Sequence, residues 1–194
     1  VPNDLYFDEN ATIYVLTGPN RGGKSVVTCA LGLAQVMLQL GMFIPAEEAK
    51  ISPVDAIFTH FPTGAEDTID KGRLGEECDR LREIFEVVTP YSLVLMDESF
   101  SSTGAYEASY IAAVLGALSH VGCRCLFSTH LHQLAAELDE INARAKESGG
   151  AMIDTLVAGM ETGQRSFKIY RRKPDGKSYA RDIAEKYGIS YDTI

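Results

Sequence analysis

Apolar segments alternate with amphipathic ones along most of the chain. The run ATIYVLTG (11–18) is rich in β-branched and aromatic residues and ends in Gly, which predicts a buried strand. The stretch KSVVTCALGLAQVMLQL (24–40) is long, apolar and free of Pro, which predicts a helix that stops at Gly41. From Leu74 to Val88 apolar residues recur at helical spacing, so a second helix is expected there.

The same alternation continues through the middle of the chain. SLVLMDE (92–98) predicts a second buried strand, and residues 104–119 predict the helix after it. CRCLFSTH (123–130) predicts a third strand, followed by a helical stretch over 131–147.

Other segments have different patterns. Residues 43–61 contain two prolines and two short apolar runs, which predicts edge strands. The polar, glycine-containing stretch 62–73 predicts a loop. Near the C-terminus, residues 152–161 and 165–173 predict a hairpin, and 178–188 predict a helix.

Strands that alternate with helices predict an α/β fold with a mainly parallel central sheet flanked by helices. The 194 residues are enough for one well-packed domain and few for two, so we expect a single domain over residues 1–194. The chain begins VPNDLYF without an initiator Met, which we interpret as a fragment of a longer protein.

Composition narrows the class of protein. Apolar residues make up 45% of the chain, as in soluble globular proteins, and the net charge of −9 disfavours direct contact with nucleic-acid phosphates. The basic cluster YRRKPDGK (170–177) is most simply a solvated hairpin turn. No apolar run reaches the ~20 residues of a spanning helix, so no membrane partner is expected. Four cysteines without a C-x-x-C pair predict buried, reduced thiols and a cytoplasmic location: Cys29, Cys78, Cys123 and Cys125.

The stretch TGPNRGGKSVV (17–27) has the most specific chemistry. Gly18, four residues and then Gly23, Lys24 and Ser25 match G-x-x-x-x-G-K-[ST] between a predicted strand and a predicted helix. Glycines let the backbone wrap a phosphate without Cβ clashes, and the helix N-terminus adds positive potential. A chance match in a glycine-rich turn is the alternative, and the strand–loop–helix context argues against it.

This motif predicts an ATP site. Lys24 would reach the β- and γ-phosphates, and the Ser25 hydroxyl would coordinate Mg²⁺. The expected ATP-binding residues are Gly18, Pro19, Asn20, Arg21, Gly22, Gly23, Lys24, Ser25 and Val26.

An acidic pair closes the second predicted strand. Asp97 and Glu98 lie at its C-terminal end, where open α/β sheets bind ligands. Asp97 would hold Mg²⁺ directly or through water, and Glu98 would orient or activate the attacking water. A surface carboxylate pair is the alternative interpretation.

Histidines follow two other apolar runs. His130 ends the third predicted strand and would sense a γ-phosphate or position water, unless it is a satisfied structural histidine. His132 is expected to begin a helix, and His60 to be structural. The predicted catalytic residues are therefore Lys24, Glu98 and His130.

Three motifs taken together, TGPNRGGKS, SLVLMDESFSST and STHLHQL, resemble the ATPase domain of the MutS DNA mismatch-repair family. Asn20 is a distinctive mark, because that family's loop reads G-P-N-x-x-G-K-S. The resemblance runs over nearly the whole chain and implies a P-loop NTPase of the ABC type that uses ATP and Mg²⁺. It implies Asn20 near the β- and γ-phosphates, Ser25 and Asp97 on Mg²⁺, Glu98 on the water and His130 as a switch.

The resemblance also implies a homodimer that closes on ATP. Each of its two composite sites would be capped by a signature segment of the other protomer. The segment from Ser101 to Thr103, which includes Ser102, would meet the partner subunit, and Ser178 and Tyr179 would lie near the dimer surface. Mismatched or structured DNA would be bound by domains outside residues 1–194.

The signature segment departs from the family pattern. Residues 71–76 read KGRLGE. At the positions that match residues 72–76, the family has Gly-Arg-Ser-Thr-Phe, so Gly72 and Arg73 are kept. Leu74 and Gly75 thus replace the Ser-Thr pair, and Glu76 replaces the Phe. Arg21 also replaces the usual apolar residue of the phosphate loop. These differences predict a divergent MutS-related protein rather than the housekeeping mismatch sensor.

Two alternative functions stay open. A nucleotide-binding module with little hydrolysis would have lost activity with the signature serine, although Lys24, Asp97 and Glu98 are intact. An ABC-type ATPase with a non-DNA partner would need an LSGGQ-like signature and a Gln-bearing loop, and residues 43–90 contain no Gln.

Overall fold

The computed structural model describes residues 1–62, 72–100, 106–130, 134–161 and 164–174. The elements of the first half are β1 (Ile13–Thr17), α1 (Lys24–Gln39), β2 (Ile57–His60) and α2 (Gly72–Val87). Those of the second half are β3 (Leu93–Asp97), α3 (Glu107–Val121), β4 (Arg124–Ser128), α4 (Ala135–Ser148), β5 (Ile153–Glu161) and β6 (Gln164–Arg171).

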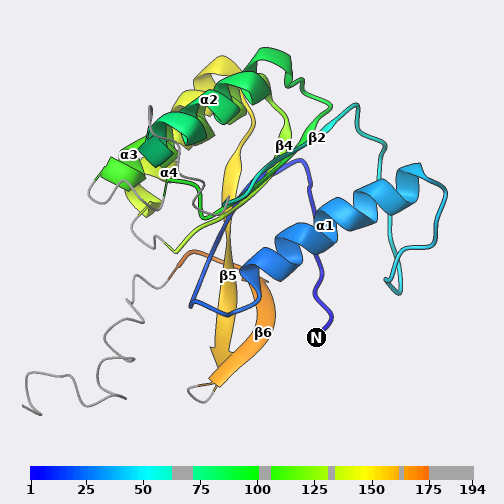
Figure 1. Ribbon diagram of the computed structural model, residues 1–194. Helices are drawn as coiled ribbons and strands as arrows, with labels where there is room; N and C mark the ends of the chain where they lie inside the picture. The colour runs from blue at the N-terminus through cyan, green and yellow to red at the C-terminus, as the bar shows by residue number, and fades with distance from the viewer. Residues whose placement is uncertain (63–71, 101–105, 131–133, 162–163, 175–194) are drawn as a thin grey trace, which may run out of the picture.

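The six strands form one mixed sheet in the order β2-β3-β4-β1-β5-β6 (Figure 1). Strand β1 pairs in parallel with β4 and β5, and β3 pairs in parallel with β2 and β4. The last pair, β5 and β6, is the antiparallel hairpin that the sequence predicted. The expected α/β fold with a mainly parallel sheet is therefore confirmed.

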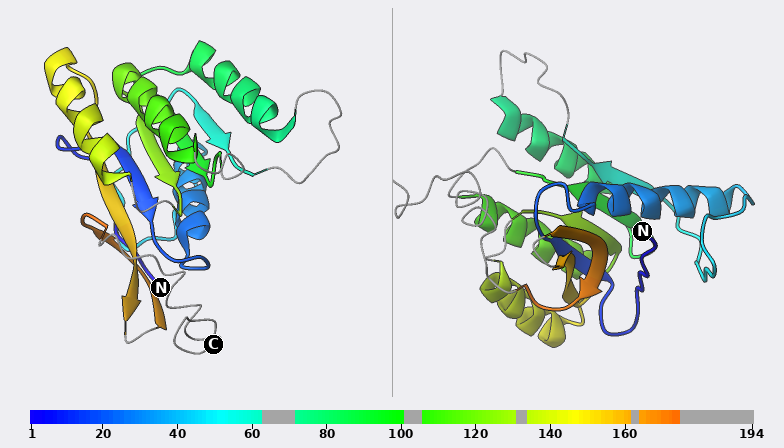
Figure 2. Two further views of the ribbon diagram at one scale, coloured as in Figure 1. Left: turned by 90° about the vertical axis from the view of Figure 1, so that its left-hand side faces the viewer. Right: turned by 90° about the horizontal axis from the view of Figure 1, so that it is seen from below.

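Helices cover both faces of the sheet (Figures 1 and 2). Because side chains alternate along a strand, β3 sends Val94 and Met96 into the core beneath α2, α3 and α4, and Leu93 and Leu95 into the core beneath α1. Strands buried on both faces read as continuous apolar runs, which is why the pattern of the sequence identified them.

The strand register brings the predicted site together. Asp97 of β3 lies opposite Ser128 of β4, and Leu16 of β1 also lies opposite Ser128. The C-terminal ends of these three strands, where the phosphate-loop motif and the acidic pair begin, therefore form one edge of the sheet.

The prediction of more than one strand in residues 43–61 was wrong, because only β2 forms there, at the edge of the sheet. Side chains of α1 bond the backbone that would have formed the other strand. Gln35 Nε2 donates to Ser52 O (3.0 Å), and Gln39 both donates to Val54 O (3.1 Å) and accepts from Val54 N (3.0 Å). These backbone groups of Ser52 and Val54 are thus hydrogen-bonded without a neighbouring strand.

The cysteine prediction was half right. Cys123 and Cys125 are buried free thiols that face the same core, whereas Cys29 and Cys78 are free and exposed on α1 and α2. The helical spacing of the apolar residues from Leu74 to Val88 includes Cys78, so its exposure runs against that pattern.

Other predicted features fall outside the described residues, including the helix over 178–188 and most of the loop over 62–73. Among the residues that the structure describes, no helix combines the length and apolar character that crossing a bilayer requires.

Candidate nucleotide site

The segment between β1 and α1 curls into a tight loop. Three of its residues have left-handed backbone angles: Gly18 (φ +139°), Arg21 (φ +60°) and Gly23 (φ +91°). Gly22 N donates to Pro19 O at 3.1 Å, which closes a turn, and Gly23 caps the N-terminus of α1. Two of the three left-handed positions are glycines, for which this conformation carries no Cβ penalty.

The loop rests on the β5–β6 hairpin. A Cβ on Gly18 would lie 2.7 Å from Ala158 Cβ, so β5 approaches the loop closely enough to require glycine. From β6, Arg165 Nε donates to Asn20 O at 2.9 Å. The loop therefore contacts both strands of the hairpin.

Lys24 folds back over this loop. The side chain is buried, and its Nζ donates to Gly18 O at 3.1 Å and to Pro19 O at 3.3 Å. Burial lowers the pKa of Lys24, and the charges of Glu98 and Asp97 act in the opposite direction. Next along α1, Ser25 and Val26 are exposed. A cation thus lies at the loop, with two carboxylates within electrostatic reach and a serine hydroxyl open to solvent.

Strand β4 fixes the acidic pair. The Ser128 hydroxyl donates to Asp97 Oδ1, and Glu98 N donates to Ser128 O at 2.8 Å. Glu98 has a left-handed backbone (φ +45°), which is uncommon for a residue with a side chain. Both carboxylates are half-buried, so they remain open to a ligand at this edge.

His130 follows β4 and lies beside a carboxyl that the sequence analysis missed. Its Nε2 is 3.7 Å from Glu107 Oε2, in the first turn of α3. The Glu107 side chain is only 6% exposed, and its other oxygen, Oε1, has no hydrogen-bond partner among the described residues. Burial raises the pKa of Glu107, His130 lowers it, and Glu98 raises it. In the sequence Glu107 looks like an ordinary acid at a helix start, so no local signal could have identified it.

His60 lies in the core, as expected of a structural histidine. It is buried, and its two ring nitrogens lie 2.6 Å from Ser99 Oγ and 3.2 Å from Glu77 O. Burial lowers the pKa of His60, which favours the neutral ring.

The residues at which the signature segment differs from the family pattern lie in the first turns of α2: Leu74, Gly75 and Glu76. That helix begins at Gly72, which has a left-handed φ of +65°. The other predicted interface and helix-start residues lie outside the described part of the chain: Ser101, Ser102, Thr103, His132, Ser178 and Tyr179.

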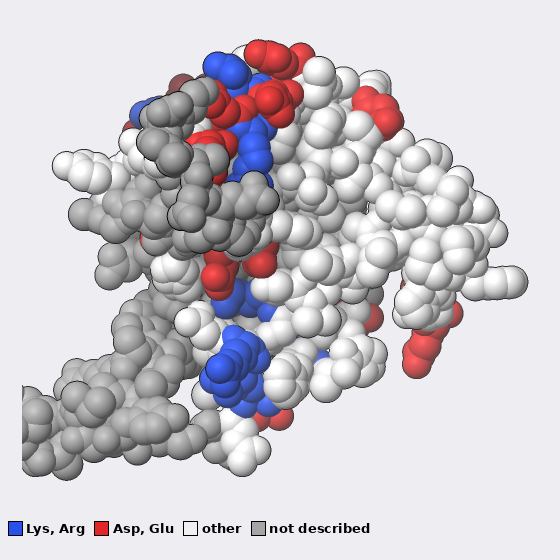
Figure 3. Space-filling view, viewed as in Figure 1, with Lys and Arg blue, Asp and Glu red and all other residues white. Residues whose placement is uncertain are grey.

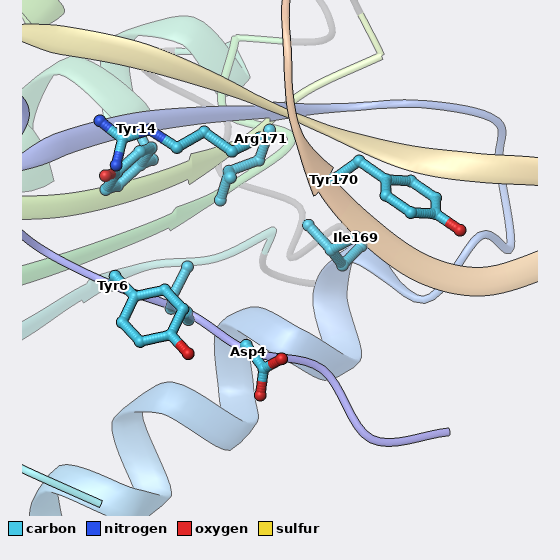
Figure 4. Close-up of a pocket in the computed structure, with 8 residues that line it drawn as sticks. Asp4, Tyr6, Tyr14, Ile169, Tyr170 and Arg171 are labelled. Atoms are coloured by element: carbon cyan, nitrogen blue, oxygen red, sulfur yellow. The ribbon is translucent and has the colours of Figure 1, made fainter.

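A separate cavity of about 210 Å³ lies between the N-terminal segment and strands β1, β5 and β6 (Figure 4). In it the Arg171 guanidinium lies 5.2 Å from the centre of the Tyr14 ring and pairs with Asp8 and Asp154 at 2.6 Å each. None of the lining residues belongs to the loop 18–25 or to the acidic pair. This cavity is therefore distinct from the candidate nucleotide site.

Charges of both signs meet on the face that carries the loop. Figure 3 shows Lys and Arg side chains gathered over the region of the β5–β6 hairpin and the loop, with Asp and Glu side chains directly above them. Basic side chains attract phosphates, and carboxylates are ligands that divalent cations prefer. Their proximity on this face is compatible with a phosphate ligand that carries a divalent cation.

Comparisons with known proteins agree on a family. Residues 14–188 match the family model described as MutS domain V. A protein named DNA mismatch repair protein MutS from Lactobacillus delbrueckii is 38% identical over 164 residues, covering 79% of this chain and 19% of that protein. Proteins of the same name from Chlorobium chlorochromatii and Geobacillus kaustophilus are 33% and 35% identical, cover all of this chain, and are themselves covered over 22% and 21%.

The chain thus spans about a fifth of the length of these curated relatives. The family model covers far more than half of the chain, from β1 to beyond β6. This protein therefore belongs to the MutS family, as a domain V.

Proposed function

We propose that this chain binds ATP with Mg²⁺ and hydrolyses it, as the motor domain of a divergent MutS-family protein. The observation that carries the proposal is the buried Lys24 ammonium, which sits on two loop carbonyls within electrostatic reach of Asp97 and Glu98. Burying a cation costs free energy unless a negative charge compensates it. The phosphates of ATP would supply that negative charge.

The loop residues fit a triphosphate. Lys24 Nζ would exchange the carbonyl oxygens of Gly18 and Pro19 for phosphate oxygens, and the N–H groups at the start of α1 would donate to them. The Ser25 hydroxyl and Asp97 would hold Mg²⁺, which when bound neutralises phosphate charge and stabilises the transition state. The Ser128 hydroxyl already orients Asp97 for that role.

Hydrolysis would depend on Glu98. Its carboxylate would orient a water molecule for in-line attack on the terminal phosphate and accept its proton, while Lys24 stabilises the developing charge. His130 would contact the same phosphate, held in orientation by the Glu107 carboxyl 3.7 Å away.

In this proposal two chains close over two ATP molecules, and DNA with a mismatch or an unusual structure is bound by further domains of the protein. The relatives' name, DNA mismatch repair protein MutS, supports the link to DNA. A second candidate is a domain that binds ATP with little hydrolysis, favoured by Leu74 and Gly75 in place of the family's Ser-Thr pair.

Equilibrium binding of ATP tests the proposal. We expect Lys24→Ala to weaken MgATP affinity about tenfold or more while the circular dichroism spectrum is kept, because the replacement removes the cation that faces the phosphates. Lys50→Ala, at an exposed lysine outside the site, is the matched control and should bind as the unaltered chain does. Equal affinity in the Lys24→Ala and Lys50→Ala variants would refute the phosphate-loop assignment.

A further inference from the structure

The turn after the acidic pair is strained. Glu98 has φ +45° and Phe100 has φ +64°, so two residues with side chains adopt the left-handed region on either side of Ser99. Such conformations persist only when surrounding contacts hold them. Because the turn sets where the Glu98 carboxylate points, the contacts that hold it matter for the reaction.

Two of these contacts come from the sheet. Glu98 N donates to Ser128 O of β4, and Ser99 Oγ lies 2.6 Å from His60 Nδ1 at the end of β2. The other ring nitrogen of His60 faces Glu77 O, which can only accept. The ring proton therefore lies on Nε2, and Nδ1 accepts the hydrogen bond from the Ser99 hydroxyl.

The third contact comes from α2. The Glu77 carboxylate accepts a hydrogen bond from Phe100 N at 2.8 Å, across 23 residues of sequence. Both residues are buried, at 4% and 1% exposure. The Phe100 ring stacks between His60 and Tyr110, with ring centres 6.2 and 5.5 Å away. This bond pins the far end of the strained turn, since a buried N–H has no water to replace its acceptor.

We propose that Glu77 is a positioning residue for ATP hydrolysis, which holds the Glu98–Phe100 turn, and with it the Glu98 carboxylate, through the N–H of Phe100. The inference rests on the proposed function and goes beyond it. Glu77 directly follows the segment 71–76, so it links the start of α2 to the residue that orients water. Among the described residues, a shift of α2 would reach the turn through this bond and through His60, which contacts both Glu77 O and Ser99 Oγ.

Three variants test the role of Glu77. Glu77→Leu keeps a side chain of similar size but removes the acceptor, and Glu77→Gln keeps an amide oxygen that can accept from Phe100 N. Glu83→Leu makes the same change at an exposed position of α2 and is the control. We expect Glu77→Leu to lower kcat about tenfold to 100-fold, since small misplacements of reacting groups have such effects. KM for ATP should stay within about threefold, because the loop is untouched.

The conservative variant and a nucleotide-free readout separate positioning from folding. Glu77→Gln should restore kcat to within about threefold of the unaltered chain. Exchange of the Phe100 amide proton, measured by NMR without nucleotide, should be faster in Glu77→Leu and near normal in Glu77→Gln and Glu83→Leu.

The results separate failure of the Glu77 role from failure of the proposed function. If the unaltered chain hydrolyses ATP and Glu77→Leu matches it in kcat, the positioning role is overturned while the proposed function stands. If Glu77→Gln loses as much kcat as Glu77→Leu, the Phe100 bond is not what positions Glu98. An unaltered chain without MgATP binding or turnover would instead contradict the proposed function itself.

Discussion

Glu98 lies close to a buried cation and to a second, buried carboxyl. It raises the pKa of Lys24 on one side and that of the buried Glu107 on the other, so all three groups share one small region. Its backbone N–H is fixed on Ser128 O, and its φ of +45° turns the side chain away from the regular strand direction. The backbone of Glu98 is therefore held by β4, while its side chain stays half-buried at this edge of the sheet.

Replacing Glu98 by Gln tests that task. The amide keeps the size of the side chain but cannot accept a proton from water, so we expect ATP affinity within about threefold of normal and kcat lower by about 100-fold. The rate of phosphate release and an ATP titration measure the two effects. Glu83→Gln, exposed on α2, is the control. Turnover of Glu98→Gln at the normal rate would remove Glu98 from the mechanism.

The four thiols should separate into two classes. Burial raises the pKa of Cys123 to about 11 and holds the pKa of Cys125 well above its usual value, while Cys29 and Cys78 are exposed. Because the thiolate is the reactive form, a thiol reagent at pH 8 should label Cys29 and Cys78 in the folded chain and all four in denaturant. A double Cys29→Ser, Cys78→Ser chain should show no labelling before unfolding. Rapid labelling of that chain would contradict the burial of β4.

At the scale of residues, a motif of adjacent positions could be located from the sequence, whereas contacts between distant residues could not. The loop from Gly18 to Ser25 was legible because every part of the motif is adjacent in sequence. Glu77 and Glu107 were not, since their partners Phe100 and His130 lie 23 residues away in each case and no local pattern marks a carboxyl that will become buried.

Among the elements, the β5–β6 hairpin packs against the loop between β1 and α1. Ala158 leaves no room for a side chain at Gly18, and Arg165 bonds the carbonyl of Asn20. The loop therefore depends on contacts with distant parts of the chain, since Arg165 follows Asn20 by 145 residues.

Gly18→Ala should destabilise the chain by about 1–3 kcal/mol, because its Cβ would lie 2.7 Å from Ala158 Cβ at a φ of +139°. Gly116→Ala, in α3 with no atom within 4 Å of the new Cβ, is the control. It should stabilise the chain by up to about 1 kcal/mol through helix propensity. Urea denaturation measures both, and equal effects of the two replacements would show that the loop does not pack on β5.

The order of elements was largely predictable because buried parallel strands are continuous apolar runs. The exception, residues 43–56, shows why such runs are not sufficient. Val54 is buried and apolar, yet its N–H and C=O bond the Gln39 side chain, so that no strand is needed. Side chains that take over backbone hydrogen bonds leave no periodic signal.

At the level of the whole molecule, the chain carries a net charge of −9, and two copies repel each other unless a ligand compensates. In the proposed closure MgATP would lie between the protomers and supply contacts to both. We expect the Glu98→Gln chain with MgATP to reach twice the 21.2 kDa mass of one chain in light scattering, and the same chain without nucleotide to stay at one mass. An unchanged mass at saturating MgATP would exclude closure by this domain alone.

The most direct test is the rate of phosphate release by this chain at saturating ATP, with Mg²⁺ and with excess chelator. We predict steady turnover that requires Mg²⁺ and falls to background in Lys24→Ala, because Ser25, Asp97, Lys24 and Glu98 would act on one bound triphosphate. If the unaltered chain binds MgATP but releases phosphate no faster than Lys24→Ala, hydrolysis by this domain is contradicted. It would leave this domain V as a nucleotide-binding module.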